Sequence, residues 1–341
     1  MKICFLVLLL CALATAQMTV QKSNTEENLR GISAVSQSVA WASGTHGTFL
    51  RTIDGGATWE VGHVPGAESL DFRDVEAFNA DDASLLAAGP GEQSRIYKTT
   101  DGGKNWTLQF TNHDPKGFFD CMAFWDHEHG IAVGDPVDGK FQLIKTENGG
   151  RDWKAVLATN LPAAIEGEGA FAASGTCIAV QGKKNVWFVT GGNAARVFRS
   201  QDAGETWSVA ETPIIHGPAS AGVFSVAFRD AMHGIVVGGD YKEPDKDVAS
   251  VATTSDGGKT WTLAPIRPQK YFSAVAFDPA NTRWTVAVGT SEYASSNDIG
   301  EHKWQTLLQA PAQLNAVSIS RSRVWAVGMK GAIFVADGPK K

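Results

Sequence analysis

An eight-residue motif recurs along this chain and constrains the fold more than any other feature. Each copy begins with Thr or Ser, has Asp or Asn as its third residue, has Gly near its middle and ends with Trp. Five copies have this form, a sixth has one extra residue, and the intervals between the third residues are 47, 47, 54, 54 and 42. These third residues are Asp54, Asp101, Asn148, Asp202, Asp256 and Asp298. A period of about 40 to 50 residues predicts a β-propeller or a solenoid.

A second repeat precedes the motifs and sets the number of units. Segments such as LLAAG (85–89) and IAVG (131–134) occur seven times, and the seventh, WAVG (325–328), is not followed by a closing Trp strand. Each unit offers four short strands with alternating apolar residues. We therefore predict an all-β fold, a seven-bladed β-propeller of four-stranded antiparallel blades with the motif in hairpin turns. The segment MTVQ (18–21) is expected to complete the last blade, so that the mature N-terminal strand closes the ring.

The first sixteen residues have the features of a cleaved secretory signal. Lys2 precedes an apolar run that ends at Leu13, and small residues follow at Ala14 and Ala16. We therefore expect residues 1–16 to be a signal peptide, residues 17–341 to form one propeller, and the protein to be exported to the periplasm or secreted. No later stretch reaches the roughly 18 apolar residues that a membrane span needs.

Composition excludes several classes of protein. Charged residues make up only 19% of the chain, whereas glycine occurs 36 times and tryptophan 11 times, which fits neither a coiled coil nor a disordered chain. The formal net charge of -6 argues against a nucleic-acid partner, because binding to phosphates normally requires a basic excess.

The repeated motif has a structural explanation that requires no ligand. Its Asp carboxylate can accept backbone N–H bonds across a tight turn, its Gly can adopt positive φ, and its Thr or Ser hydroxyl can bond to the same turn. Calcium takes about six to eight oxygen ligands, whereas each motif has essentially one carboxylate. We therefore predict structural turns, no metal site and no other cofactor.

These motifs resemble the Asp-box repeats, also called BNR repeats, of sialidases, xyloglucanases, sortilin-type receptors and photosystem II stability/assembly factors. Over the whole mature chain, the resemblance is closest to the assembly factors and their non-photosynthetic bacterial relatives. The reason is that the boxes alternate with strands such as those in RVWAVGMKGAIF (323–334). The resemblance implies an exported, chaperone-like factor that binds a newly made membrane-protein subunit. It is specific for the fold and weak for the function, since hydrolases and binding proteins share the box.

Charged residues gather on the expected innermost strands of the first three blades. Aligning these strands places Arg30, Asp74 and Asp120 at one position and Glu76 two residues later, in an otherwise apolar ring. A buried carboxylate needs a partner, and Arg30 or Arg73 is the expected partner of Glu76. Two interpretations remain open, namely an ion pair that joins adjacent blades and an acidic centre that binds a ligand.

Three connections exceed the length of the repeat and carry further candidates. They are residues 134–140, 160–175 and 238–248, all expected on the face opposite the boxes. Functional residues concentrate on such loops over a rigid scaffold, although solvated loop charges would give the same pattern. The binding candidates in these connections are Asp135, Asp138, Lys140, Glu166, Glu168, Asp240, Tyr241 and Lys242, and Arg196 is a further binding candidate on the same face.

Two cysteines remain after signal cleavage, Cys121 and Cys177, at equivalent positions of adjacent innermost strands. In an oxidising compartment they could form a disulfide if their Cα atoms lie within about 7 Å. The alternative is two small buried thiols.

Two functions are consistent with these features. The first is a monomeric exported scaffold that binds a protein or peptide partner, as the resemblance implies. The alternative is a glycan-binding or glycoside hydrolase propeller, sialidase-like or xyloglucanase-like, that uses the carboxylates of the loop-rich face. No nucleophile elbow, phosphate loop or dinucleotide fingerprint requires catalysis, and we assign no catalytic residue.

Overall fold

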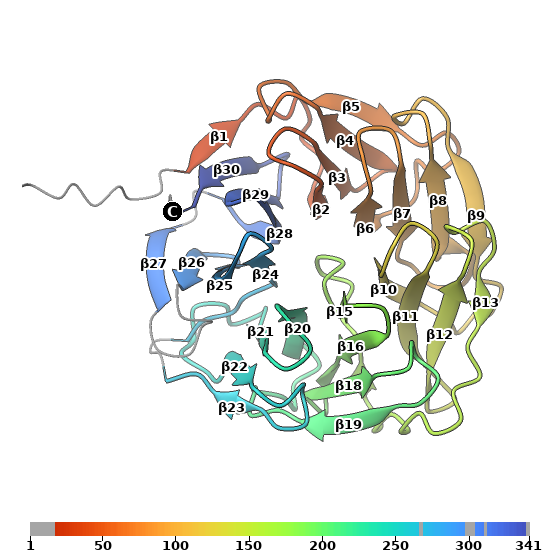
Figure 1. Ribbon diagram of the computed structural model, residues 1–341, viewed down its shortest axis with the longest axis vertical. Coiled ribbons are helices and arrows are strands. Elements are labelled where there is room, and N and C mark those ends of the chain that lie inside the picture. Colours follow the sequence, from red (N-terminus) through yellow and green to blue (C-terminus); the bar gives the residue numbers. More distant parts are fainter. Residues whose placement is uncertain (1–17, 266–268, 297–303, 310–311, 339–341) are drawn as a thin grey trace, which may run out of the picture.

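The protein folds into a closed ring of seven blades, shown in Figure 1 by a computed structural model. The structure describes residues 18–265, 269–296, 304–309 and 312–338. The predicted signal peptide and Asp298 lie outside the described residues. Seven four-stranded antiparallel blades were expected from the repeats, and the fold confirms this prediction.

The strands follow one another from the axis to the rim in each blade. The first three blades consist of β2 (Leu29–Ala34), β3 (Ala40–Gly44), β4 (Thr48–Thr52) and β5 (Glu60–His63); β6 (Phe72–Ala77), β7 (Ala83–Ala87), β8 (Arg95–Thr99) and β9 (Thr107–Thr111); and β10 (Phe119–Phe124), β11 (Gly130–Val137), β12 (Lys140–Thr146) and β13 (Lys154–Ala155). The fourth and fifth consist of β15 (Ile178–Gln181), β16 (Asn185–Val189), β18 (Arg196–Ser200) and β19 (Ser208–Glu211), and of β20 (Ala221–Phe228), β21 (Gly234–Asp240), β22 (Val251–Thr254) and β23 (Thr262–Leu263).

The sixth blade consists of β24 (Ala274–Asp278), β25 (Asn281–Val288), β26 (Glu292–Ser296) and β27 (Trp304–Gln309). The seventh contains β28 (Leu314–Ser320), β29 (Arg323–Gly328) and β30 (Ile333–Asp337), and its outermost strand is β1 (Thr19–Gln21). Two short strands, β14 (Glu168–Gly169) and β17 (Gly191–Gly192), extend the sheet of the fifth blade. Among the described residues the only helical element is the 3-10 turn Gly91–Gln93, so no helix there is long and apolar enough to cross a membrane.

The ring is closed by pairing between the two ends of the described chain. Strand β1 runs antiparallel to β30, with Thr19 opposite Val335 and Gln21 opposite Ile333. Figure 1 shows the red strand β1 beside the blue strand β30. This confirms the expected closure by the N-terminal strand. It also covers the edge that β30 would otherwise expose.

Large aromatic side chains fill the space between the blades. Trp41, Trp187 and Trp325 lie on the second strands of their blades and are at most 1% exposed. The indole of Trp41 donates to the Asn79 carbonyl of the next blade at 3.1 Å. Trp187 likewise donates to the Gly257 carbonyl at 2.9 Å, so these two side chains bury apolar area and satisfy their N–H groups at the same time, whereas the N–H of Trp325 is buried without a partner.

The five Asp boxes that the structure describes in full are hydrogen-bonded turns on one face of the ring, which we call the box face. In the first, the Asp54 carboxylate accepts from the Thr58 N–H at 2.9 Å and from the Thr58 hydroxyl at 2.6 Å. The hydroxyl of Thr52 donates to Asp54 and accepts from the Gly56 N–H. The bonds from Thr58 lower the pKa of Asp54 to about 2. The carboxylate is therefore engaged within its own turn.

A backbone bulge corrects the expected alignment of the innermost strands. In β2, β6 and β10 the pairing with the second strand shifts by one residue, and the bulged residues are Arg30, Arg73 and Asp120. Arg73, and not Asp74, is therefore equivalent to Arg30 and Asp120. The predicted alignment of Asp74 and Glu76 with the other innermost strands is therefore wrong by one residue. It paired Asp74 with Asp120 because both are aspartates, but the bulged residue of β6 is Arg73.

Cys121 and Cys177 form a disulfide, with Cα atoms 6.0 Å apart. Cys121 lies on β10 and Cys177 immediately precedes β15. The bond therefore joins the innermost parts of the third and fourth blades covalently.

Candidate functional site

A loop crosses the mouth of the central channel on the face opposite the boxes, which we call the loop face. This plug segment comprises residues 170–176 of the connection into the fourth blade. The Ala172 carbonyl accepts from Arg73 of the second blade at 2.9 Å, and the Ser174 hydroxyl donates to the Ser273 carbonyl beside the sixth blade at 3.2 Å. Figure 1 shows the loop beside β15 near the centre of the ring.

Aromatic stacking fixes the same segment to the fifth blade. Phe171 lies parallel to Phe224, with ring centroids 3.9 Å apart and an interplanar angle of 4°. Tyr271 and Tyr241 meet the edge of Phe224 at 5.0 and 6.1 Å. The plug segment is thus held by blades on opposite sides of the channel. The unusual length of the connection between the third and fourth blades was visible in the sequence. The residue types in it did not indicate that part of it would lie across the channel.

Below the plug segment is a cavity of about 310 Å³ whose walls combine apolar side chains with polar groups. Each blade contributes at least one apolar side chain, namely Ile32, Val75, Ala123, Ile178, Val226, Val275 and Val317. Asp74 and Glu76, two residues apart on β6, also line it. Gly175 of the plug segment lies against the Asp74 carboxylate.

The two carboxyl groups of this cavity retain protons more tightly than usual. Burial raises the pKa of Glu76 from 4.5 to about 8. Burial, reinforced by the charge of Glu76, raises the pKa of Asp74 well above its usual value, although the Met122 N–H donates to Asp74 at 2.7 Å. Within the described part of the chain, no three His, Cys, Asp or Glu side chains are grouped as a metal site would require.

The expected ion pair between Glu76 and an arginine is wrong. Arg73 donates instead to Asp71, at 2.8 Å, and Arg30 approaches the same carboxylate at 3.9 Å. Asp71 lies in the connection that precedes β6. Both arginines sit on bulges at the loop-face end of their strands, which turns them toward the connections and away from the channel cavity.

Asp120 and Asp135 form a second pair of carboxyl groups near the plug segment. Burial, together with the charge of Asp135, raises the pKa of Asp120 well above its usual value, and Arg73 opposes this shift. Burial raises the pKa of Asp135 to about 6, against the bond that Asp135 accepts from the Ala170 N–H at 2.9 Å. One oxygen of Asp120 is buried without a hydrogen-bond partner.

Glu168, in the connection into the fourth blade, and Arg196, at the start of β18 of that blade, form a buried ion pair. Their side chains are 0% and 8% exposed, and Arg196 Nε donates to Glu168 at 2.8 Å. The Thr190 hydroxyl donates to the same carboxylate at 2.6 Å. Glu168 is therefore fully paired, whereas nearby Glu166 is exposed.

The remaining predicted residues lie at the margins of the loop face. Asp138 is exposed and pairs with Lys116 at 3.0 Å, in the two-residue turn between β11 and β12. Lys140 follows this turn and is exposed. The predicted seven-residue loop is thus mostly strand. On the fifth blade, Asp240 accepts from the backbone N–H of Lys242 at 2.9 Å, while Tyr241 is 47% exposed.

A groove of about 470 Å³ runs over the third, fourth and fifth blades on the loop face. Asp135 and Pro136 form one side, and the backbone of residues 167–171 and 191–192 forms much of the rest. Lys116, Phe118 and Ala219 complete the rim. The sequence identified Asp135 and the long connection, but not Lys116, Phe118 and Phe171. Nothing in the types of these three residues indicates that they lie close together in the fold.

Comparison with known proteins gives a consistent picture. Residues 11–156 match the family described as photosynthesis system II assembly factor YCF48. The photosystem II assembly lipoprotein Ycf48 of Synechococcus sp. (strain CC9902) is 24% identical over 290 residues, which cover 74% of this chain and 81% of the relative. The chain is thus similar in sequence and in fold to the photosystem II assembly factor-like Asp-box propellers.

Solved structures of such assembly factor-like propellers share the fold. A structure of YCF48 bound to D1 peptide superposes with a TM-score of 0.67 at 15% identity, covering 96% of both chains. YCF48 from Cyanidioschyzon merolae gives a TM-score of 0.65 at 18% identity, covering 94% of this chain and 98% of that chain. The chloroplastic stability/assembly factor HCF136 of Arabidopsis thaliana is 25% identical over 126 residues, which cover 36% of this chain and 29% of the relative.

Proposed function

We propose that this protein is an exported assembly-type scaffold that binds an extended segment of a protein partner in the loop-face groove. The groove carries the proposal, because it combines main-chain walls, the aromatic ring of Phe118 and charges of both signs at Lys116 and Asp135. An extended peptide offers matching backbone groups and alternating side chains. The YCF48 structure described with a D1 peptide supports a peptide as the occupant.

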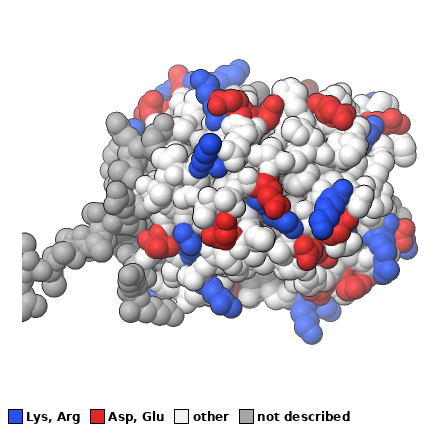
Figure 2. Space-filling model, turned by 90° about the horizontal axis from the view of Figure 1, so that it is seen from above, with Lys and Arg blue, Asp and Glu red and all other residues white. Residues whose placement is uncertain are grey.

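The partner that best fits is a newly exported membrane-protein subunit. The names of the relatives connect such propellers with assembly of photosystem II, and the apolar segment at residues 3–13 supports export of this chain. The side of the ring drawn in Figure 2 shows acidic and basic side chains interspersed. Mixed charge suits a protein partner better than a polyanion.

The positions of the carboxyl groups weigh against glycoside hydrolysis on the loop face. A hydrolase needs two reachable carboxyl groups on either side of a glycosidic bond. Glu168 is buried against Arg196, and Asp120 is 1% exposed. Asp74 lies beneath the plug segment. Three of the carboxylates that the sequence suggested, Glu168, Asp120 and Asp74, are thus paired or covered.

A blocking variant tests the position of the binding groove. Ala219 is exposed on the groove rim, so Ala219→Arg should obstruct a peptide without disturbing the core. Ala57, an exposed alanine in the first box, supplies the matched control Ala57→Arg. The partner recovered by crosslinking from the exported fraction should bind A219R at least about tenfold more weakly than A57R. Equal binding to both variants would place the partner elsewhere.

A further inference from the structure

On the box face, each pair of neighbouring blades is separated by a shallow groove, which we call a crease and number by the first of its two blades. In the first crease, between the first and second blades, an arginine fills the space. Arg51 of the first blade donates to Glu60 at 3.1 and 2.8 Å and to the Ala80 carbonyl of the second blade at 2.9 Å. Its guanidinium also lies against Gly102 of the second box. In the third crease, Lys145 reaches Glu205 of the fourth box at 3.0 Å, and both residues line a pocket of about 540 Å³ that stays open beside this ion pair.

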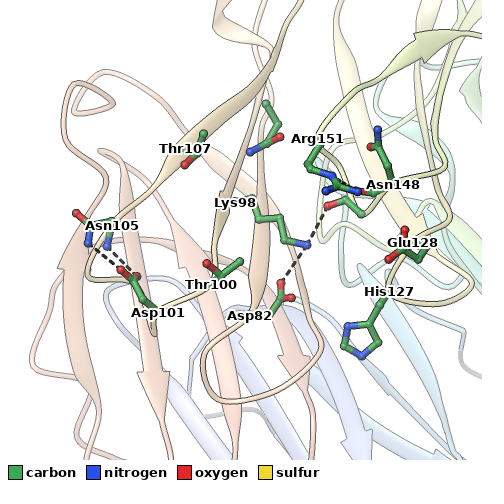
Figure 3. A pocket seen from close by; sticks show the side chains of 12 residues that line it. Asp82, Lys98, Thr100, Asp101, Asn105, Thr107, His127, Glu128, Asn148 and Arg151 are labelled. Carbon is green, nitrogen blue, oxygen red and sulfur yellow. Dashed lines mark hydrogen bonds and ion pairs between the residues drawn. The ribbon is translucent and has the colours of Figure 1, made fainter.

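In the crease between the second and third blades, no arginine occupies the position of Arg51. The equivalent cation is Lys98, which contacts Asp82 at 3.2 Å and donates to the Gly149 carbonyl of the third box at 2.9 Å. Thr107 stands opposite Lys98 in the strand pair, where Glu60 stands opposite Arg51. A shorter cation and a short hydroxyl side chain leave a pocket of about 410 Å³, drawn in Figure 3.

The second difference lies in the third box. Its sixth residue is Arg151, at the position where the fourth box has Glu205. Arg151 therefore cannot pair with Lys98, and its Nε donates to the Asn148 carbonyl of its own turn at 3.1 Å. Figure 3 shows Arg151 and Asn148 on one side of the pocket, with Lys98 between them and Thr107.

The walls combine hydrogen-bond donors and acceptors at close spacing. Glu128 is exposed, and its carboxylate has no hydrogen bond or ion pair with any residue that the structure describes. His127 packs one side of its ring on Phe78, with centroids 4.4 Å apart, and remains exposed. The polar lining side chains are Asp82, Lys98, Thr100, Asp101, Asn105, Thr107, Gln109, Glu128, Asn148 and Arg151.

We propose that this crease pocket binds a neutral saccharide unit. Each sugar hydroxyl both donates and accepts, which matches walls that offer ammonium, guanidinium, amide and carboxylate groups together. Lys98 and Arg151 carry two positive formal charges and Asp82, Asp101 and Glu128 carry three negative ones. Because Asp101 is hydrogen-bonded by Asn105 within its own box, the lining has no strong excess of either sign for selecting an ion. The exposed side of the His127 ring offers a flat surface for one face of the sugar. The volume falls in the range of about 300 to 1,000 Å³ typical of small-ligand sites.

The first blade suggests a variant that closes the pocket without disturbing the fold. Thr107→Glu reproduces the pairing of Arg51 with Glu60, because Thr107 is exposed and lies opposite Lys98. Ser208 is exposed and lies opposite Arg199 in the fourth blade, so Ser208→Glu is the matched control. The variant His127→Ala removes the imidazole ring on which the sugar is proposed to lie. It should therefore weaken saccharide binding independently of Thr107→Glu.

The test is binding of immobilised neutral oligosaccharides and of free hexoses, followed by saturation-transfer NMR. The wild type and S208E should bind at least one saccharide, whereas T107E and H127A should bind it at least about tenfold more weakly. Absence of saccharide binding by the wild type would overturn the proposal, and so would equal binding by T107E. Capture of the protein partner at the loop face should be unchanged in T107E, so this proposal and the proposed function fail separately.

Discussion

Arg196, at the start of β18, binds Glu168 of the connection into the fourth blade, and neither side chain has appreciable contact with solvent. Nε of Arg196 donates to one carboxylate oxygen at 2.8 Å, and a second guanidinium nitrogen donates to the other. The same guanidinium donates to the Ala163 carbonyl at 2.9 Å. This pair holds the start of the segment that crosses the channel, so its loss should affect both stability and the plug segment.

Replacing Arg196 by Met should be strongly destabilising. The substitution leaves Glu168 buried without its positive partner, which typically costs about 3 to 5 kcal/mol. Denaturant unfolding at neutral pH measures the change. Replacing both partners, in Glu168→Leu with Arg196→Met, should cost less than Arg196→Met alone, because no unpaired charge remains. A double variant that is less stable than the single one would contradict this account.

Glu76 should make stability depend on pH in the neutral range. Its pKa rises from 4.5 to about 8 on folding, so the folded state holds a proton that the unfolded chain releases. Its stabilising contribution is therefore complete below about pH 4.5 and is lost as the pH rises toward 8, by up to about 1.4 kcal/mol per pH unit. Glu76→Gln cannot ionise and should lose less stability between about pH 5 and pH 8 than the wild type.

Guanidinium unfolding midpoints at a series of pH values provide this measurement. Glu166→Gln is the matched control, because Glu166 is an exposed carboxylate on the same face of the ring. Its curve should run parallel to that of the wild type. If the Glu76→Gln curve were also parallel, Glu76 would not be the proton-binding group.

Reducing the disulfide should weaken the junction between the third and fourth blades. Cys121 and Cys177 are 56 residues apart in sequence, and closing a loop of this length stabilises by roughly 4 kcal/mol in the chain-entropy treatment. Unfolding of the wild type with and without reductant, with thiol titration of both samples, measures the difference. Equal stability of the oxidised and reduced protein would show that the bond adds no constraint.

Removing residues 18–21 should open the ring. The deletion takes away β1 and exposes the edge of β30, so the melting temperature should fall by about 5 °C or more and edge-to-edge association should increase. Calorimetry and size-exclusion chromatography report the two effects. Val20→Lys is the control, because that side chain is 66% exposed and the strand is retained. A truncated chain that melts like the control would argue against closure by β1.

The repeat in the sequence was sufficient to predict the blades, their number and their closure. Each Asp box specifies its own turn through contacts within a few residues, as Thr52, Asp54 and Thr58 show. Local hydrogen bonds and strand alternation do not depend on distant parts of the chain. For that reason the architecture could be predicted from sequence without an alignment of relatives.

The candidate site depended on contacts that join distant segments. The bulge at Arg73 shifts β6 by one residue, which sends Arg73 to Asp71 and leaves Asp74 and Glu76 together in the channel. Residue spacing cannot reveal such a shift, because a bulge changes the face of each residue without changing its type.

The sequence by itself thus determined a seven-bladed ring, since its turns and strands are specified locally and repeated. Only the tertiary structure decided that residues 170–176 cross the channel and that Arg196 neutralises Glu168. Both arrangements depend on which groups from different blades share a buried environment. There the cost of an unpaired charge or an unsatisfied hydrogen bond selects the partners.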